Sequence, residues 1–269
     1  QINCAWFAPV MTNMLLNFTE RDRYDVSSLQ WCIGGGERTP ESRIRDFTEL
    51  FTNSRYIDAY GLTESFGGDT LMKTGMEMEK IGSTGQAIMH VEVNIRDNEG
   101  NSLPHGEEGE ICLRGPKITN GYWRDPAKTK AAFHSENWLR SGDIGHLDKD
   151  GFLFLTDRKK DMIISGGENI ASSEVERVLY QMSDILEAAI IGVPDKQWGE
   201  RVAAAIVPKP GKKIDLTMIN THCRAHLASF KSPKEIHIVS ALPRNPSGKV
   251  LKRILRDQLA SKNNYVAQS

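Results

Sequence analysis

Residues 29–62 read LQWCIGGGERTPESRIRDFTELFTNSRYIDAYGL, and the pattern of this segment indicates the type of fold. Two short apolar runs, 29–33 and 55–60, have the length and composition of buried strands. The segment between them follows Pro40 and is predicted to be an amphipathic helix. Its apolar face is formed by Ile44, Phe47, Leu50 and Phe51.

A strand, a helix and a strand at this spacing predict a right-handed crossover between parallel strands. In such a unit the loops that follow the two strands, 34–38 and 60–64, lie at the same edge of the sheet. Open α/β sheets bind their ligands at that edge. The sequence therefore predicts one ligand pocket bordered by both loops.

Beyond this unit the pattern changes twice. Residues 91–156 carry short alternating strands separated by turn clusters, which predicts a small antiparallel sheet or barrel. The charged residues 157–161 follow, and Ser173 and Glu176 then have the spacing of a helix capping box. The remaining strands and helices predict a separate small α+β domain.

The predicted fold class is therefore α/β and α+β. A large domain is expected over 1–156, with an α/β part over 1–80 and a barrel-like antiparallel part over 81–156. A boundary over 157–161 separates it from a small domain over 162–269. A length of 269 residues agrees with two domains.

The composition argues against several classes of function. With 34 basic and 35 acidic residues, the chain has no overall field to attract nucleic acid or an anionic membrane, which favours a small-molecule partner. The four cysteines form no CxxC pair, which favours reduced thiols in a cytoplasmic protein. The uncharged apolar runs, such as 188–193, are far shorter than the roughly 20 residues of a membrane helix.

Several loops carry groups that suit a nucleotide. Tyr60, Thr63 and Glu64 offer a flat ring, a hydroxyl and a carboxylate, which suit adenine stacking, phosphate binding and Mg²⁺. Asp143 could accept both hydroxyls of a ribose, and Lys249 could bring a charge to a phosphate. Taken alone, each signal also fits an ordinary strand exit, a surface turn or a solvated lysine.

Taken together and in order, these segments resemble the adenylate-forming superfamily of acyl-CoA synthetases, adenylation domains and firefly luciferase. The resemblance extends over essentially the whole chain and points to the carboxyl-terminal portion of an acyl- or aryl-CoA ligase. It rests on GGGE at 34–37, YGLTES at 60–65, GEICLRG at 109–115 with GYW at 121–123, SGDIG at 141–145, DRKKDMIISGGENI at 157–170 and NPSGK at 245–249.

The resemblance implies a role for each matching residue. Lys249 would contact the substrate carboxylate and the α-phosphate, with Thr63 on phosphate and Glu64 on Mg²⁺ as the other catalytic residues. Asp143 and Arg158 would hold the ribose. The residues implied to bind the nucleotide are Gly35, Gly36, Glu37, Tyr60, Gly61, Thr63, Asp143, Leu155, Arg158 and Lys249.

The implied activity is that of an AMP-forming carboxylate–CoA ligase that uses ATP, Mg²⁺ and CoA. The family rotates its small domain between its two half-reactions, and Lys160 matches the hinge position, although a solvated linker lysine is the alternative. The sequence SGGEN at 165–169 resembles that of free-standing CoA ligases more than that of adenylation domains that serve carrier proteins. The CoA tunnel would be lined by Ser165, Gly166, Gly167 and Glu168.

The superfamily's Ser/Thr/Gly-rich phosphate loop, expected upstream of YGLTES, has no match in this sequence. The chain also opens at Gln1 rather than at a methionine, so we expect a piece of a longer protein that is inactive alone. Two alternatives stay open. One is an adenylating enzyme that passes the acyl group to a carrier protein, and the other is a nucleotide-binding fragment without turnover.

The identity of the carboxylic acid is not specified by this portion. The near wall of the acyl pocket is predicted to be mostly apolar, which suits an alkyl or an aryl acid. Its residues would be Trp31, Ile33, Ala59, Ser65, Phe66 and Gly67.

Two further patterns in the sequence concern a metal and a modification. His222 and His226 lie four residues apart on a predicted helix, but no glutamate follows the first histidine as in zinc proteases, so a metal is not favoured. The surroundings of Lys249 resemble the site at which a lysine acetyltransferase switches off bacterial acyl-CoA synthetases, since acetylation removes the charge. We expect neither a nucleic-acid partner nor a membrane span.

Overall fold

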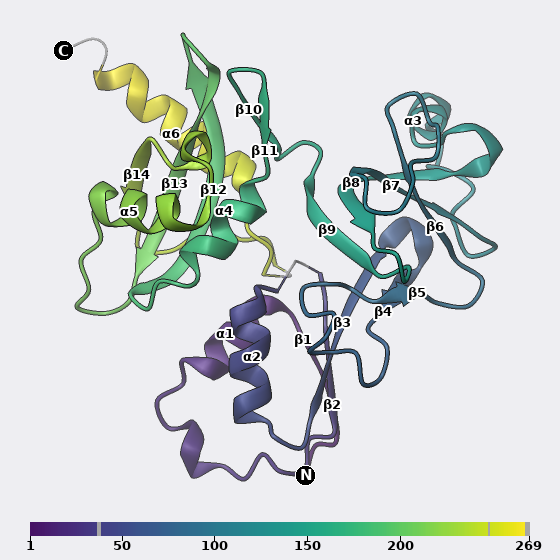
Figure 1. The fold of residues 1–269 in the computed structure, drawn as a ribbon, viewed down its shortest axis with the longest axis horizontal. Helices are drawn as coiled ribbons and strands as arrows, with labels where there is room; N and C mark the ends of the chain where they lie inside the picture. Colours follow the sequence, from purple (N-terminus) through teal and green to yellow (C-terminus); the bar gives the residue numbers. More distant parts are fainter. Residues whose placement is uncertain (37–38, 247, 267–269) are drawn as a thin grey trace. The chain divides into compact units, whose positions relative to one another are not determined.

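The structure is a computed structural model that describes residues 1–36, 39–246 and 248–266. The chain divides into two compact units, Gln1–Lys159 and Lys160–Ser269, which are coloured purple to teal and teal to yellow in Figure 1. No helix in the described ranges is long and apolar enough to cross a membrane.

The first unit contains a five-stranded sheet of order β1-β2-β3-β4-β5. The first three strands are parallel and the last two are antiparallel to their neighbours. Helices α1 and α2 lie side by side along these strands (Figure 1). The bounds are β1 Cys4–Phe7, α1 Pro9–Leu16, β2 Trp31–Gly34, α2 Glu41–Leu50, β3 Arg55–Leu62, β4 Gly67–Leu71 and β5 Gln86–Ala87, with 3₁₀ turns η1 Arg21–Arg23 and η2 Thr63–Ser65.

The predicted strand, helix and strand of 29–62 correspond to β2, α2 and β3. Ile44 and Phe47 of α2 are buried against Cys32 of β2 and Tyr56 of β3, so the helix turns its apolar face to the sheet as predicted. Cys32 and Tyr56 alternate along their strands with less buried residues. This parallel arrangement brings the ends of β2 and β3 to one edge.

The second sheet of this unit has four antiparallel strands in the order β6-β7-β8-β9. The expected barrel is wrong, because the sheet is open, with β6 and β9 at its edges in the part of the chain that is described. Its apolar residues pack with Tyr60 of β3, so the sheet buries that face without closing on itself. The bounds are β6 Glu92–Arg96, β7 Gly109–Arg114, α3 Pro126–Ala131, η3 Ser135–Asn137, β8 Leu139–Leu147 and β9 Leu153–Arg158.

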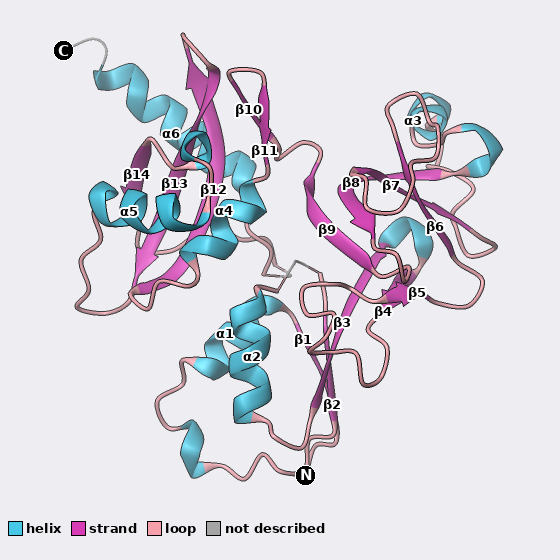
Figure 2. Cartoon of the chain, viewed as in Figure 1, coloured by secondary structure: helices cyan, strands magenta, loops and turns pink. Residues whose placement is uncertain are grey.

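The second unit has a sheet of order β11-β10-β13-β12, with β14 parallel to β13. Figure 2 shows this sheet in magenta among cyan helices. Alternate residues of the long β12–β13 pair enter two cores: Ile190 packs with α4 and α5, whereas Ile191 packs with α6. The bounds are β10 Ile163–Ser165, β11 Glu168–Ile170, α4 Ser172–Leu179, β12 Ile185–Asp195, β13 Gly199–Pro208, α5 Leu216–His226, η4 Ser229–Lys231, β14 Glu235–Ile238 and α6 Lys252–Val266.

The expected capping box is also wrong. Helix α4 has Ala171 at its N-cap and begins at Ser172, one residue before the serine of that pattern. The side chain of Glu176 instead accepts a hydrogen bond from the backbone N–H of Ile190 at 2.8 Å. It also lies 2.7 Å from the Lys252 ammonium, so a tertiary contact displaces the local one.

Replacing Phe47 with alanine tests the packing of the first unit. Phe47 is fully buried, with ring centroids 4.5 Å from Phe51 and 5.2 Å from Tyr56. We expect Phe47→Ala to lower the free energy of unfolding by about 3–5 kcal/mol. Urea denaturation followed by tryptophan fluorescence measures this loss, because four of the five tryptophans lie in this unit. The half-exposed Phe18 is the matched control, and equal losses for Phe18→Ala and Phe47→Ala would contradict the packing described here.

Candidate functional site

The carboxyl end of β3 meets the antiparallel sheet through one buried polar contact. The Tyr60 hydroxyl donates a hydrogen bond to Asp143 Oδ2 at 2.8 Å, and both residues are more than nine-tenths buried. Burial and the neighbouring Asp143 carboxylate raise the pKa of Tyr60 well above its ordinary value, so the hydroxyl stays protonated and donates. Two residues 83 positions apart, both predicted for the nucleotide site, are thus in contact.

Arg158 joins this pair across the β8–β9 ladder. It is the register partner of Asp143, and its Nε lies 3.3 Å from Asp143 Oδ1. Cross-strand pairs of opposite charge stabilise such a ladder, and this one also leaves the guanidinium partly exposed beside the carboxylate. Leu155 of β9 packs partly buried against the cluster that contains Tyr60. The structure therefore brings four of the predicted nucleotide residues together.

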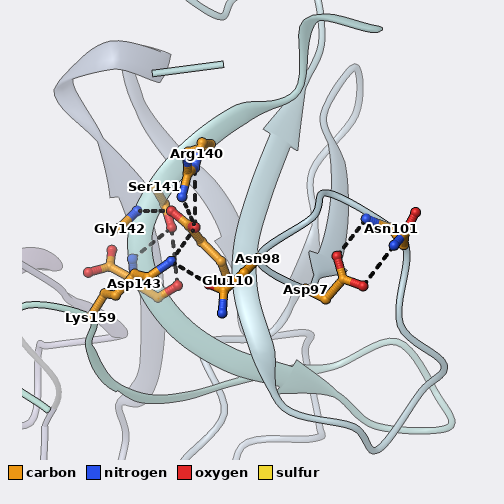
Figure 3. A network of polar contacts seen from close by, with 9 residues as sticks. All are labelled: Asp97, Asn98, Asn101, Glu110, Arg140, Ser141, Gly142, Asp143 and Lys159. Atoms are coloured by element: carbon orange, nitrogen blue, oxygen red, sulfur yellow. Dashed lines mark hydrogen bonds and ion pairs between the residues drawn. The ribbon is translucent and has the colours of Figure 1, made fainter. Parts of the chain in front are cut away.

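The turn before Asp143 fixes the direction of its side chain. Gly142 has φ +73°, in the left-handed region that favours glycine. The Asp143 N–H donates to Ser141 Oγ at 3.0 Å, and the Gly142 N–H donates to Glu110 Oε1 at 3.2 Å. Figure 3 shows these groups gathered around Glu110. A carboxylate held in this way could accept hydrogen bonds from two ribose hydroxyls.

Glu64 is held by a residue to which the sequence analysis assigned no role. Tyr122, in the GYW segment, donates from its hydroxyl to Glu64 Oε1 at 2.8 Å. The Glu64 carbonyl accepts from the Thr119 N–H at 2.7 Å. The Lys128 ammonium lies 3.9 Å from the centroid of the Tyr122 ring, a cation–π contact. The GYW loop therefore positions the carboxylate predicted to bind Mg²⁺.

A carboxylate oxygen is the kind of donor that Mg²⁺ prefers, so Glu64 fits that role chemically. No group of three or more His, Cys, Asp or Glu side chains suited to a metal occurs among the described residues. Mg²⁺ is commonly bound through one or two carboxylates together with substrate phosphates. Glu64 would hold the ion in that way, with Thr63 next to it on the same η2 turn.

A second polar network that the sequence does not predict includes Ser65 of the η2 turn. Asp69 is fully buried and accepts a hydrogen bond from the Ser65 hydroxyl, and its Oδ1 lies 2.9 Å from Lys117 Nζ. Lys117 also donates to the Gly67 carbonyl at 3.1 Å. Burial raises the pKa of Asp69, although the hydrogen bonds from Ser65 and Lys117 oppose this shift. Neither residue belongs to a motif, so only a structure could find this pair.

The predicted acyl-pocket residues differ in how they are presented. Trp31 and Ile33 alternate with the buried Cys32, so they lie on the face of β2 opposite to the one that packs on α2. Phe66 is 82% exposed with φ +57°, next to Gly67 with φ +93°. The Ser65 hydroxyl is engaged with Asp69 instead of pointing to solvent. Ala59 lies on β3, and its Cβ would be 3.9 Å from a Cβ at Gly35.

The glycine-rich loop after β2 has little room for side chains. A Cβ at Gly34 would lie 1.8 Å from the Tyr56 hydroxyl, and one at Gly35 would lie 3.3 Å from the Ala59 carbonyl oxygen. Gly36 has φ +95°. Glu37, a predicted nucleotide contact, lies outside the described residues. A side chain at Gly34 or Gly35 would therefore crowd β3, whereas a Cβ at Gly36 would meet nothing within 4 Å, so the backbone is open to a ligand at Gly36.

The second unit carries the remaining candidates. The loop that ends in Lys249 is closed by Asn245, whose Oδ1 accepts from the Lys249 N–H at 2.8 Å and whose N–H donates to the Lys249 carbonyl at 3.0 Å. Arg244 anchors the loop, because its Nη2 lies 2.8 Å from Glu187 Oε1. Lys160, the predicted hinge residue, is the first residue of this unit.

The predicted CoA-tunnel segment, Ser165 to Glu168, forms the tight turn between β10 and β11. Gly166 and Gly167 both have positive φ, at +61° and +86°. The Gly166 N–H donates to the Trp198 carbonyl at 2.8 Å, and a Cβ at Gly166 would lie 2.8 Å from the Trp198 ring. This turn therefore requires glycine on both conformational and steric grounds.

The histidine pair of α5 makes backbone contacts. His222 Nε2 lies 3.0 Å from the Val178 carbonyl, and His226 Nδ1 lies 3.0 Å from the His222 carbonyl. These contacts account for one ring nitrogen of each histidine. His222 is partly buried and His226 is exposed.

Comparison with known families supplies the decisive observation. The chain matches the family "AMP-binding enzyme" over residues 1–123 and "AMP-binding enzyme C-terminal domain" over residues 174–249. The chain belongs to the AMP-binding, or adenylate-forming, superfamily. Within this superfamily it corresponds to the carboxyl-terminal half of acyl- and aryl-CoA ligases.

Proteins similar to this chain include two CoA ligases and an amide bond synthetase. Long-chain-fatty-acid–CoA ligase FadD13 of Mycobacterium tuberculosis is 38% identical over 253 residues, which are 94% of this chain and 49% of that protein. The amide bond synthetase McbA from Marinactinospora thermotolerans has a TM-score of 0.88 at 35% identity, covering 96% of this chain and 52% of McbA. The anthranilate CoA ligase AuaEII, in complex with anthranoyl-AMP, has a TM-score of 0.88 at 29% identity, covering 97% and 51%.

The chain thus spans about half the length of the relatives that it matches. The first family match covers Tyr60, Glu64 and Tyr122, and the second covers Lys249. Asp143 and Arg158 lie between the two matched ranges. The roles assigned to these residues remain predictions.

The buried Asp69 gives a pH-dependent prediction. The variant Lys117→Met removes the ammonium and leaves the buried Asp69 carboxylate with one partner fewer. We expect the free energy of unfolding to fall by about 3 kcal/mol at neutral pH. This is the low end of the range for a broken buried ion pair, since Lys117 is partly exposed. A raised pKa in the folded state means that the folded protein binds this proton more tightly than the unfolded chain. Stability is therefore gained as the pH falls through that raised pKa, and the loss in Lys117→Met should shrink as the pH is lowered from neutral.

Urea denaturation at several pH values measures this effect. The matched control is the double variant Asp69→Asn/Lys117→Met, which has no carboxyl to titrate at this position. A loss in Lys117→Met that is independent of pH, or that the double variant reproduces at every pH, would refute the assignment to Asp69.

Proposed function

We propose that the full-length protein containing this chain joins a carboxylic acid to CoA through an acyl-AMP intermediate. The observation that carries the proposal is the convergence of Tyr60, Asp143 and Arg158 at the carboxyl end of a parallel strand. Open α/β sheets bind nucleotides at such edges. Similarity to FadD13 and AuaEII, both named as CoA ligases, supports the same conclusion.

In the first half-reaction an oxygen of the acid would attack the α-phosphorus of ATP, and the bond to pyrophosphate would break. Negative charge shifts during this displacement and needs neutralisation at fixed positions. Lys249 would contribute one positive charge between the carboxylate and the α-phosphate. Asp143 would hold the ribose. Tyr60 and the glycine loop at Gly35 would border the adenine. Mg²⁺ bound through Glu64 would supply further positive charge to the phosphates.

In the second half-reaction the thiol of CoA would attack the acyl carbonyl, and AMP would leave with the electrons of the acyl–oxygen bond. A change of arrangement at Lys160, the first residue of the second unit, would exchange the Lys249 loop for the Ser165–Glu168 turn. The glycines of that turn would leave room for the narrow pantetheine arm. The division into a large domain over 1–156, a hinge over 157–161 and a small domain over 162–269 is part of this proposal.

The class of acid stays broad in this proposal. Trp31, Ile33 and Phe66 offer an apolar wall without a charged group, which suits an alkyl or aryl acid. FadD13 is named for long-chain fatty acids and AuaEII for anthranilate, so relatives of both kinds are similar to this chain. Transfer of the acyl group to a carrier protein stays an open alternative, and regulation of Lys249 by an acetyltransferase stays a prediction.

A second candidate function is amide synthesis, which the similarity to the amide bond synthetase McbA favours. Both reactions begin with acyl-AMP, and they differ in whether a thiol or an amine attacks the acyl carbonyl. The same adenylation site would therefore serve either. Supplying the full-length protein with CoA in one reaction and with a primary amine in another separates the two.

Replacing Lys249 tests the proposed chemistry. We expect Lys249→Ala in the full-length protein to lower acyl-AMP formation by about a hundredfold or more, because a charge directed at the reacting phosphate is lost. Pyrophosphate release with a panel of fatty and aromatic acids measures this rate, and thioester appearance measures the whole reaction. The exposed Lys213 provides the matched control, Lys213→Ala. Acyl-AMP formation that is unaffected by Lys249→Ala would exclude the assigned role.

Tyr122→Phe tests whether the GYW loop positions Glu64. The variant keeps the aromatic ring that contacts Lys128 but loses the hydrogen bond to Glu64. We expect the adenylation rate to fall about tenfold at saturating ATP and the Mg²⁺ concentration for half-maximal rate to rise. Trp123→Phe, at a neighbouring and highly exposed ring, is the control. A normal Mg²⁺ dependence in Tyr122→Phe would mean that the hydroxyl does not position Glu64.

A further inference from the structure

Glu110 stands at the centre of a buried polar network that no predicted role explains. It lies on β7 and is 4% exposed. Its Oε2 lies 2.9 Å from Arg140 Nη2 and 3.2 Å from Lys159 Nζ, and its Oε1 accepts from the Gly142 N–H at 3.2 Å. Figure 3 shows these donors converging on one carboxylate.

The charge of Glu110 is compensated locally. Burial alone would raise the pKa of Glu110, but the hydrogen bonds from Arg140 and Lys159 outweigh this effect and lower it. The carboxylate is therefore ionised at neutral pH. An ionised group inside a protein favours the arrangement in which its cations are present, because leaving it unpaired is costly.

Lys159 is attached to the first unit in two ways. Its backbone N–H donates to the Gly142 carbonyl at 2.9 Å. Its Nζ donates to Asn98 Oδ1 at 2.9 Å as well as to Glu110. Lys159 is also the last residue of that unit, since the second compact unit begins at Lys160.

The peptide groups of Gly142 link these two sites. The Gly142 N–H bonds to Glu110, and the Gly142 carbonyl bonds to Lys159, while the next residue is Asp143. A displacement of Lys159 would therefore pull on Gly142 directly. The same displacement would disturb the carboxylate that Tyr60 and Arg158 contact.

We propose that Glu110 is a positioning residue that ties the Ser141–Asp143 turn to Lys159. The chain is thereby held to the first unit up to its last residue, and any reorientation of the second unit begins beyond it. The link to nucleotide binding rests on the proposed function, which gives Asp143 the ribose. Because coupling between two sites is reciprocal, nucleotide held at Asp143 also stabilises the attachment of Lys159.

The test uses the full-length protein and Lys159→Met, which removes the charge and keeps a long apolar stem. Hydrogen exchange is measured at the Lys159 amide, with and without AMP, and the dissociation constant for AMP is measured by calorimetry. We expect the Lys159 amide to exchange about tenfold faster in the variant and AMP to bind several-fold more weakly. Added AMP should slow this exchange in the unaltered protein and much less in the variant.

Two further variants sharpen the result. Glu110→Gln should have a larger effect in the same direction, and Asn98→Ala, which removes the other partner of Lys159, tests the attachment if the glutamine variant does not fold. Glu92→Gln is the matched control, because Glu92 pairs with Arg114 at an exposed position of the same sheet. It should leave both measurements unchanged.

Unchanged exchange at Lys159 in Lys159→Met would overturn the proposed attachment. Faster exchange with unchanged AMP affinity would overturn the link to the Asp143 turn. A failure of the unaltered protein to bind AMP would instead refute the proposed function, and the exchange measurements would still decide whether Glu110 holds Lys159.

Discussion

The hydrogen bond from Tyr60 to Asp143 is the contact on which the candidate nucleotide site depends. It joins the end of a parallel strand, β3, to the antiparallel β8–β9 pair, and it is buried on both sides. A buried carboxylate needs donors, and here the Tyr60 hydroxyl and Arg158 provide them. The two sheets therefore have one favourable position relative to each other at this point. The residues proposed to bind the base and the ribose come from both sheets, and this contact fixes the spacing between Tyr60 and Asp143.

Two further buried carboxylates of the first unit each have a cation beside them. Asp69 has Lys117 and Glu110 has Arg140. Such pairs add little net stability compared with apolar residues of similar size, because removing two charges from water offsets their attraction. Their effect is selective, since an arrangement that separates carboxylate from cation leaves a buried charge. The loops around the η2 turn and the Ser141–Asp143 turn are therefore restricted to conformations that keep these pairs.

The features that follow from local sequence pattern were predictable, and those that need distant partners were not. The crossover of 29–62 could be predicted because the spacing of Ile44 and Phe47 is enough to identify the buried face of α2. The predicted barrel was wrong because closure of a sheet depends on what packs against its apolar face. Here Tyr60 of β3, a strand of the other sheet, packs against that face. The capping box was wrong because Glu176 is engaged by Ile190, which is 14 residues further along. Tyr60, Asp143 and Arg158 could be named from motifs, but the pair Asp69 and Lys117 has no signal in the sequence.

The loop that carries Lys249 shows why motion of a whole unit suits the proposed reaction better than a change within a loop. Asn245 closes this loop through its own side chain and backbone, and Arg244 fixes it to Glu187 on β12. Moving Lys249 by refolding the loop would break all of these contacts together. Moving the second unit as a body would keep them and would change only a few backbone angles near Lys160. Because the β8–β9 register includes Asp143 with Arg158, and Lys159 is held by Gly142 and Glu110, the chain before Lys160 is equally constrained. The freedom for such a motion is therefore confined to the short stretch between two firmly held segments.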